Sequence, residues 1–258
     1  MMYLSHVDAS ERGMWLIEQL RQRGRVDVAE AAAEFGTAEM TIRRDLDALV
    51  QRGVARRVRG GAVSLLMRGE ELPFAMREMS AAAAKQRIGA AAAELIADGE
   101  AVGLDGGTTV LETARALRGR RLTVLPVSLH AAMAFADSPS VRLLMPGGEV
   151  RPGELSVVGP ATLATIAALR LDTVVLACCG ISPEGQVTTH DLGDAAVKQA
   201  LIGCARRTIL VLDGSKFAHS AMAVVCEATS VDVVVTDDTA PAEAIASLEA
   251  AGTIVHRV

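Results

Sequence analysis

Residues 38–53 read AEMTIRRDLDALVQRG, and the spacing of the apolar side chains in this stretch predicts a helix that ends at Gly53. Ile42, Leu46 and Leu49 recur at the helical repeat of 3.6 residues and therefore share one side of the helix. The opposite side holds residues that a core does not need, which are Met40, Arg44, Asp47 and Gln51, with Thr41 and Arg43 at its flanks. The helix thus offers one side to a core and the other to solvent or a partner.

Two shorter helices are expected before this one. The first runs from Ser10, a capping residue, to Gly24, with apolar residues at helical spacing between them. The second follows Asp27, because Asp27 and Glu30 three residues later resemble a capping box, and it ends at Gly36. The chain therefore begins with three helices in close succession.

A hairpin and a basic patch accompany these helices. Residues 54–57 and 59–63 predict two short strands that turn near Gly60 and Gly61. Residues 40–60 carry six Arg and two Asp, a net charge of +4, although the whole chain has a net charge of −5. A basic patch confined to about twenty residues of an acidic protein favours contact with a polyanion. The alternative is an ordinary solvated helix face.

The residue types in this patch suit double-stranded DNA. An Arg side chain can donate two hydrogen bonds to guanine, so arginines near the start of a helix fit reading in the major groove. Arginines on the hairpin suit contacts with the phosphate backbone. We therefore expect DNA contacts from Met40, Thr41, Arg43, Arg44, Arg57 and Arg59.

Length and composition bound the rest of the chain. At about 150 residues per domain, 258 residues make one large unit or two domains, and 50% hydrophobic residues indicate a substantial core. No apolar run approaches the ~18 residues of a membrane span, and the first residues are too short and polar for a signal peptide, so we expect a cytoplasmic protein with no membrane partner. The four Cys lack metal-site spacing and are interpreted as core side chains, so no metal is expected.

After the charged run at 68–73 the pattern changes to alternating strands and helices. We place a DNA-binding domain at 1–63, a linker at 64–84 and a larger domain at 85–258. Continuous apolar strands between helices predict an α/β fold with a mostly parallel sheet covered on both faces. The strands are expected at 101–104, 122–127, 141–145, 173–178, 208–212, 231–236 and 253–256, and the helices at 85–97, 109–118, 129–136, 194–205 and 241–250.

A polar, glycine-rich string follows the first of these strands. It reads Asp105-Gly106-Gly107-Thr108-Thr109 and opens a helix. Glycines let backbone N–H groups approach an anion and a helix N-terminus favours negative charge, so the string fits a phosphate, with an ordinary turn and cap as the alternative. It matches neither a Walker loop nor the G-x-G-x-x-G pattern, so ATP and dinucleotides are not indicated and no cofactor is expected.

Lysine is rare, with three residues against 23 Arg, and each has a distinctive place. Lys198 follows Asp194 by one helical turn, which allows either a surface ion pair or a ligand contact. Lys216 follows a strand end beside Asp213 and fits a ligand-facing cation. Lys85 begins a helix, where the helix dipole disfavours a cation, and this placement points to a contact.

Several strings in the first 63 residues resemble one family. Glu11-Arg12, Gly24, TIRRDL at 41–46 and RVRGGA at 57–62 resemble the winged helix-turn-helix of the DeoR family of bacterial transcriptional regulators. The pattern departs at Thr37-Ala38, where the family usually has Val-Ser, and at Arg59, where it has His. Loss of the Ser cap is expected to weaken the start of the reading helix by about 1 kcal/mol.

Residues from about 85 to 236 resemble the effector domain of the same family, which is similar in fold to ribose-5-phosphate isomerase and binds phosphorylated sugars or related metabolites. Val127, Cys179 and Asp194 stand where the family has Asn, Asp and Glu, and they leave the identity of the effector open. Together with the phosphate-binding string, the resemblance implies effector contacts at Asp105, Gly106, Gly107, Thr108, Thr109, Ser128, Gly147, Gly148, Arg151, Lys198, Asp213, Ser215 and Lys216.

The sequence therefore predicts a DNA-binding repressor of a carbohydrate-metabolism operon, whose operator affinity changes when a phosphorylated sugar binds. A homo-oligomer is expected, since one winged module reads only a short site. No catalysis is expected, and two alternatives stay open. One is an isomerase-like enzyme, with Asp191 and Asp194 as the nearby acids. The other is a nonspecific architectural DNA binder, which leaves two-thirds of the chain without a role.

Overall fold

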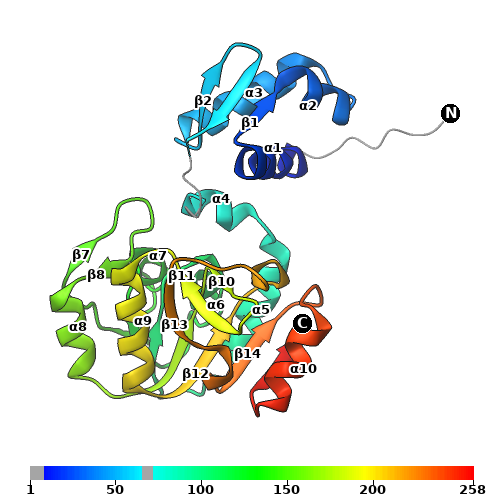
Figure 1. Cartoon of the computed structure of the whole chain (residues 1–258). Coiled ribbons are helices and arrows are strands. Elements are labelled where there is room, and N and C mark those ends of the chain that lie inside the picture. Colours follow the sequence, from blue (N-terminus) through cyan, green and yellow to red (C-terminus); the bar gives the residue numbers. More distant parts are fainter. Residues whose placement is uncertain (1–8, 66–71) are drawn as a thin grey trace. The chain divides into compact units, whose positions relative to one another are not determined.

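The computed structural model describes residues 9–65 and 72–258 and divides the chain into two units (Figure 1). The first unit is Met1–Ser80 and the second is Ala81–Val258. The segment expected as a linker, 64–84, is shared between the units and holds a short helix, α4 (Phe74–Met79). The charged residues at 68–71 lie outside the described residues.

The first unit packs short helices against a small antiparallel sheet. The expected hairpin over 54–63 forms two of its strands, and Leu16, Leu20, Ile42 and Leu46 are fully buried in its core. Its elements are α1 (Ala9–Arg23), β1 (Arg25–Asp27), α2 (Val28–Glu34), α3 (Glu39–Gln51), β2 (Ala55–Val58) and β3 (Gly61–Ser64). In the sheet, β3 lies between β1 and β2.

The N-termini of α2 and α3 are capped differently. Asp27 caps α2, because its carboxylate accepts hydrogen bonds from the N–H groups of Ala29 and Glu30. The Glu30 side chain accepts from Arg23 at 2.9 Å. At α3 the capping position is Ala38, and no side chain caps the helix there. The start of α3 therefore lacks the roughly 1 kcal/mol that a side-chain cap contributes.

The second unit is built on a seven-stranded sheet that confirms the predicted α/β fold. Its strands are β4 (Ala101–Leu104), β5 (Thr123–Pro126), β6 (Arg142–Leu143), β9 (Leu171–Leu176), β12 (Ala205–Val211), β14 (Val233–Thr236) and β15 (Ile254–Arg257). They lie in the order β15-β14-β12-β9-β4-β5-β6, and every pairing is parallel. All seven overlap the ranges expected from the apolar runs.

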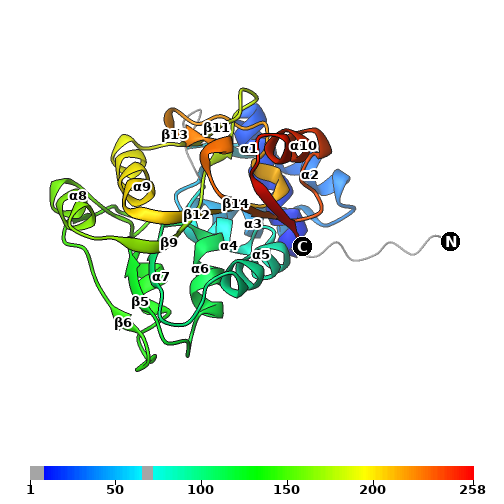
Figure 2. The same cartoon turned by 90° about the horizontal axis from the view of Figure 1, so that it is seen from below.

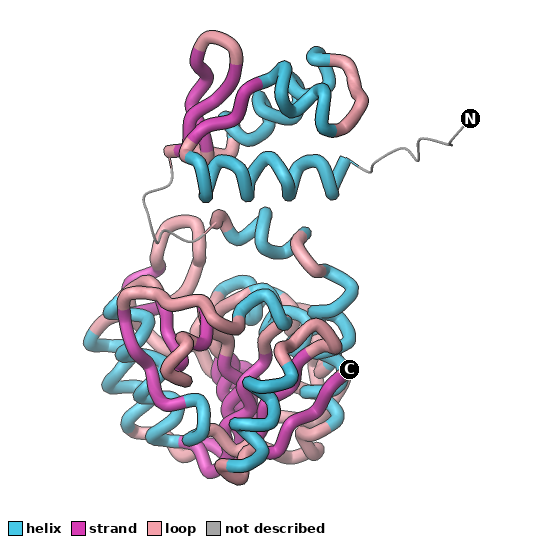
Figure 3. The backbone as a smooth tube through the Cα atoms, turned by 45° about the vertical axis from the view of Figure 1, so that its right-hand side comes forward, coloured by secondary structure: helices cyan, strands magenta, loops and turns pink. Residues whose placement is uncertain are grey.

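Helices cover both faces of this sheet. Figure 2 shows α8 and α9 on one side and α5 and α6 on the other, and Figure 3 shows the strands running between helices. Because strand residues alternate between faces, Val174 and Leu176 pack with Leu201 of α9, whereas the equally buried Val175 lies outside that cluster. The helices are α5 (Ala82–Glu94), α6 (Thr108–Ala116), α7 (Leu129–Met133), α8 (Pro160–Ala167), α9 (Leu192–Cys204) and α10 (Ala242–Ala250).

Several small elements escaped the sequence patterns. The second unit also contains two small antiparallel sheets. One pairs β7 with β8, and the other consists of β10, β11 and β13. The strands are β7 (Glu149–Val150), β8 (Val157–Val158), β10 (Gly180–Ile181), β11 (Gln186–Thr189) and β13 (Ala223–Glu227), with short 3-10 turns at η1 (Gly214–Lys216) and η2 (Ala228–Ser230). Strands of two residues are too short to show an alternating pattern.

The parallel sheet brings the predicted ligand-binding strings to one edge. In a parallel sheet all carboxyl ends lie at the same edge, so the loops after β4, β9, β12 and β14 meet there. These loops begin at Asp105, Ala177, Leu212 and Asp237. The fold thus places residues from well-separated parts of the sequence around one site.

The contact between α5 and α6 generates a prediction about stability. A Cβ atom added at Gly89 would lie 2.7 Å from backbone atoms of Glu112 and Thr113. We therefore expect Gly89→Ala to lower the free energy of unfolding by about 1–3 kcal/mol through overpacking. Gly203 is the control, because nothing lies within 4 Å of its added Cβ, and Gly203→Ala should raise stability by up to about 1 kcal/mol. Urea unfolding measures both, and equal effects would contradict the prediction.

Candidate ligand site and nucleic-acid interface

Four of the predicted DNA contacts lie on α3. Arg44 is exposed, and Met40 is 59% exposed although it is apolar. Thr41 and Arg43 are half-buried, and Arg43 pairs with Glu39 one turn earlier at 2.9 Å. The side of α3 opposite its buried stripe is therefore available to a partner.

The other two predicted contacts lie on the β2–β3 hairpin. Arg59 is exposed at the turn, and Arg57 forms an ion pair with Asp47 of α3 at 3.3 Å. The hairpin is pressed against β1, because a Cβ added at Gly61 would lie 1.9 Å from the carbonyl oxygen of Val26. The hairpin thus has a fixed position beside α3, as a wing requires.

In the second unit, Lys198 is buried between two carboxylates. Its ammonium group donates a hydrogen bond to Asp105 Oδ2 and another, at 3.2 Å, to the carbonyl oxygen of Ala177. It also lies 3.5 Å from Asp194 Oδ2. Lys198 is only 4% exposed and Asp105 only 1%, so the alternative of a surface ion pair is wrong.

These charges shift one another's pKa values. Burial lowers the pKa of Lys198, but Asp105 and then Asp194 outweigh burial and hold that pKa above its ordinary value. Burial raises the pKa of Asp105 despite the opposing effect of Lys198. Burial also acts to raise the pKa of Asp194, but Lys198, Thr189 and Arg151 bring it below its ordinary value. Lys198 is therefore protonated at neutral pH.

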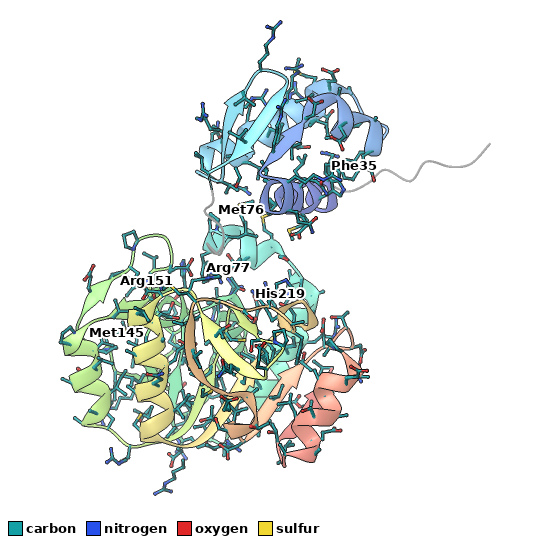
Figure 4. The ribbon with its side chains drawn as sticks, viewed as in Figure 1. Phe35, Met76, Arg77, Met145, Arg151 and His219 are labelled. Carbon is teal, nitrogen blue, oxygen red and sulfur yellow. The ribbon has the colours of Figure 1, made fainter. Side chains whose placement is uncertain are left out.

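Further polar side chains extend from Asp194. Thr189 donates a hydrogen bond to Asp194 Oδ2 at 2.7 Å, and Cys179 Sγ lies 3.5 Å from the Thr189 hydroxyl. Arg151, labelled in Figure 4, lies 3.9 Å from Asp194 and 3.7 Å from Asp191. Both ion pairs of the Arg151 guanidinium group are long, and the side chain is partly exposed, so the group can turn toward a ligand.

Two buried oxygen atoms beside this cluster lack a partner among the described residues. They are Asp105 Oδ1 and Ser128 Oγ, on side chains that are almost completely buried. An unpaired buried polar group costs about 1–3 kcal/mol. A Cβ added at Gly106 would lie 3.5 Å from Ser156 Cβ and 4.0 Å from Ser128 Cβ, so Gly106 adjoins both serines. A ligand with hydroxyl groups would satisfy the two oxygens.

The start of α6 adjoins the same place. Gly107 precedes the helix with φ at 121°, in a region that disfavours residues with a Cβ, and no side chain caps α6. Thr108 and Thr109 form the first turn and are buried. The first N–H groups of a helix lack partners within the helix and favour an anion.

Gly147 and Gly148 lie against α8. The carbonyl oxygen of Gly147 accepts a hydrogen bond from Thr162 at 2.7 Å. A Cβ added at Gly148 would lie 2.1 Å from the Thr162 hydroxyl oxygen, so the two glycines permit this close approach. The two glycines therefore let the segment between β6 and β7 pack closely against α8.

Asp213, Ser215 and Lys216 form a second group at the carboxyl edge. Asp213 accepts a hydrogen bond from the N–H of Ser215 at 3.1 Å and caps η1. Burial raises the pKa of Cys178 to about 12, and the charge of Lys216 opposes this shift. Phe217, the residue after half-buried Lys216, forms an isolated bridge with Ile181, so this group adjoins the segment that follows β9 and carries Cys179.

Sequence reasoning missed two members of the site. Thr189 ends β11, and Ser156 lies opposite Ser128 in an isolated antiparallel bridge. The polar run at 188–191 was the available signal for Thr189. Lys85, expected to begin a helix, is buried in the first turns of α5. Within residues 9–65 and 72–258, no cluster of three His, Cys, Asp or Glu suits a metal, and no helix has the length and apolar character to cross a membrane.

Two family models match the chain. Residues 12–66 match the DeoR-like helix-turn-helix domain, and residues 80–238 match the DeoR C-terminal sensor domain. The chain belongs to the DeoR family. This confirms the resemblance carried by TIRRDL and by the glycine-rich strings, and it makes the first unit a helix-turn-helix domain and the second a sensor domain.

Relatives of this DeoR-family chain are similar over most of their length. It is 32% identical to the glycerol-3-phosphate regulon repressor of Escherichia coli strain K12, across 90% of this chain and 92% of that protein. It is 32% identical to the transcriptional repressor AccR of Agrobacterium fabrum strain C58, across 88% and 89%. Among solved structures, ribose 5-phosphate isomerase A from Methanocaldococcus jannaschii aligns over 52% of this chain and 53% of that chain, with 16% identity and a TM-score of 0.39.

The buried charge cluster generates a second prediction. We expect Lys198→Met to lower the free energy of unfolding by about 3–5 kcal/mol, because it leaves Asp105 as an unpaired buried carboxylate. Urea unfolding of the full chain provides the measurement. The double variant Lys198→Met with Asp105→Asn removes both charges and should recover much of the loss. A double variant as unstable as the single one would show that the charge pairing is not the cause.

Proposed function

We propose that this DeoR-family chain is a repressor of an operon for sugar metabolism, and that a phosphorylated sugar bound to the second unit lowers its affinity for operator DNA. The observation that carries the proposal is the buried Asp105–Lys198–Asp194 cluster with its unpaired oxygens, beside the glycine-led start of α6. The repressor names of the relatives support it, and one of them is a glycerol-3-phosphate regulon repressor.

On the DNA side, α3 enters the major groove with its exposed side. Arg44 reads base edges there, because a guanidinium group can donate two hydrogen bonds to guanine. Arg59, exposed at the hairpin turn, contacts the phosphate backbone. Arg57 joins it by exchanging Asp47 for a phosphate oxygen.

On the effector side, the two parts of a sugar phosphate meet complementary groups. The phosphate lies at the start of α6, with N–H groups after Gly106, the hydroxyls of Thr108 and Thr109, and Lys216 as the cation. The sugar hydroxyls donate to the unpaired oxygen of Asp105. The ligand therefore gives a partner to Asp105 Oδ1, which has none among the described residues.

No observation favours the isomerase alternative. Aldose–ketose isomerisation needs a carboxylate that can exchange a proton with a substrate carbon. Asp194 has its pKa lowered and is engaged by Lys198 and Thr189, and Asp191 caps α9 through a hydrogen bond from the N–H of Asp194. Both carboxylates thus have structural partners.

The repressor acts as a symmetric homo-oligomer in the cytoplasm, where chromosomal DNA is found. Two related half-sites give a helix-turn-helix protein the affinity that one small module lacks. The second unit supplies the contact between protomers. If the first unit alone, Met1–Ser80, protected a complete operator with the affinity of the full chain, this part of the proposal would fail.

Arg44 and Arg52 provide a matched test of DNA reading on α3. We expect Arg44→Ala to lose about 1–3 kcal/mol of preference for operator over scrambled DNA, because it removes a base contact. Arg52, at the end of α3 beside α1 and α4, is the control and should leave this preference unchanged when replaced by Ala. Fluorescence anisotropy with both duplexes measures the preference. Equal loss on the two sequences for Arg44→Ala would remove Arg44 from the base contacts.

Calorimetric titration with a panel of phosphorylated compounds tests the effector site. The panel includes glycerol 3-phosphate, glucose 6-phosphate and fructose 6-phosphate, and operator binding is measured with and without each. Lys216→Ala should weaken binding of the active compound at least tenfold, since it removes a charged hydrogen bond. Arg206→Ala is the control, because Arg206 is 85% exposed near the opposite, amino end of β12. Failure of every phosphorylated compound to bind the wild type would refute the proposed site.

A further inference from the structure

The helix α4 belongs to the core of the first unit. Met76 is 3% exposed and Leu72 is 8% exposed, and both join the cluster that contains Ile42 and Leu49 of α3. Figure 4 labels Met76 on α4. The first unit ends at Ser80, directly after α4. Any displacement of α4 therefore acts on the side chains that support α3.

The contact of α4 with its neighbours is loosely filled. A pocket of about 190 Å³ lies where α4 meets α1 and α3. The pocket opens to solvent, and Met79, which lines it, is 52% exposed, so α4 packs against α1 and α3 over only part of its surface and has room to shift. Met side chains are flexible and repack at little cost, and three of them line the pocket. Lining residues include Gly13 and Met14 of α1, Ala48 and Arg52 of α3, and Met76 and Met79 of α4.

The contact between α1 and α3 is of a different kind. Arg12 donates two hydrogen bonds to the carboxylate of Asp45, at 2.5 and 3.4 Å, and both side chains are largely buried. Such a bidentate pair fixes distance and orientation. Asp45 also lines the pocket, so the ionic contact and the loosely filled contact are adjacent. The side of α3 that has room to adjust is the side that faces α4.

The junction after α4 is strained. Ala81 has φ at 50°, in the left-handed region that disfavours residues with a Cβ, and α5 of the sensor domain begins at the next residue. Strained residues of this kind often mark segments with two accessible conformations. Ala81 thus lies between α4, which has room to shift, and the sensor domain.

We propose that α4 is the coupling element between the two units. Effector binding in the second unit displaces α4 through the junction at Ala81. The displaced α4 moves relative to α1 and α3, and the position of α3 relative to DNA changes. This inference rests on the proposed function, because it needs an effector that changes operator affinity. A tenfold change in operator affinity corresponds to about 1.4 kcal/mol of coupling, which repacking of flexible side chains can supply.

Filling the pocket tests the proposal. Nothing lies within 4 Å of a Cβ added at Gly13, so Gly13→Leu places new atoms in the pocket and fixes α4. Gly13→Ala is the matched control, since it removes the glycine with little added volume. Operator affinity is measured by anisotropy, with and without the compound from the panel above that releases the wild type, glycerol 3-phosphate being tried first.

We expect the wild type and Gly13→Ala to lose at least tenfold in operator affinity when the compound is present, and Gly13→Leu to lose less than twofold. Because a fixed α4 resists the state that the effector prefers, calorimetry should show that Gly13→Leu binds the compound more weakly than the wild type, by no more than the coupling that is lost, whereas Gly13→Ala binds it as tightly as the wild type. If Gly13→Leu melts well below the wild type, Ala48→Met fills the same pocket from α3 and replaces it.

The outcomes separate this proposal from the one on which it rests. If the filled variants release DNA as the wild type does, α4 is not the coupling element, and the proposed function stands. If they lose more effector affinity than the coupling that is lost, the substitutions act on the sensor domain itself and the coupling proposal is overturned. If no compound of the panel alters operator binding by the wild type, the proposed function has failed, and the coupling proposal fails with it.

Discussion

One buried ammonium group holds together the loops that form the proposed ligand site of the sensor domain. Lys198 on α9 joins Asp105 at the end of β4, the carbonyl of Ala177 after β9, and Asp194 one turn away. A buried charge is tolerated only when it is paired, so these loops must keep their positions for the domain to fold. The pairing uses one oxygen of Asp105, and the other has no hydrogen-bond partner among the described residues. In the proposed function, stability and ligand recognition therefore depend on the same side chain.

The two units are stabilised by different kinds of interaction. The DNA-binding unit has a small apolar core and fixes its hairpin by a close backbone approach at Gly61. The sensor domain has a large sheet whose loops carry buried charges. Because the proposed DNA contacts are exposed side chains and the proposed ligand contacts are buried ones, substitutions at the ligand contacts should affect folding more than substitutions on the exposed side of α3.

Long, strongly patterned segments were predictable from the sequence. The stripe of Ile42, Leu46 and Leu49 predicted α3, and the apolar runs predicted all seven strands of the parallel sheet. Strands of two residues carry no readable period, and α8 (Pro160–Ala167) is absent from the helices expected from the sequence. The burial of Lys198 was not predictable, since its spacing from Asp194 suits a surface pair equally well and Asp105 lies 93 residues away. Local pattern reveals elements but not long-range partners.

The ion pair of Arg57 with Asp47 has a consequence for the search along DNA. In the proposed function Arg57 contacts a backbone phosphate, and in the free protein the Asp47 carboxylate occupies the position of that phosphate. Each duplex that the protein meets must displace this internal competitor before it gains the phosphate contact. Random DNA gives only backbone contacts to compensate for the lost ion pair, whereas an operator also gives base contacts. We infer that the pair shortens residence on random sequence and leaves more of the protein free to find its operator.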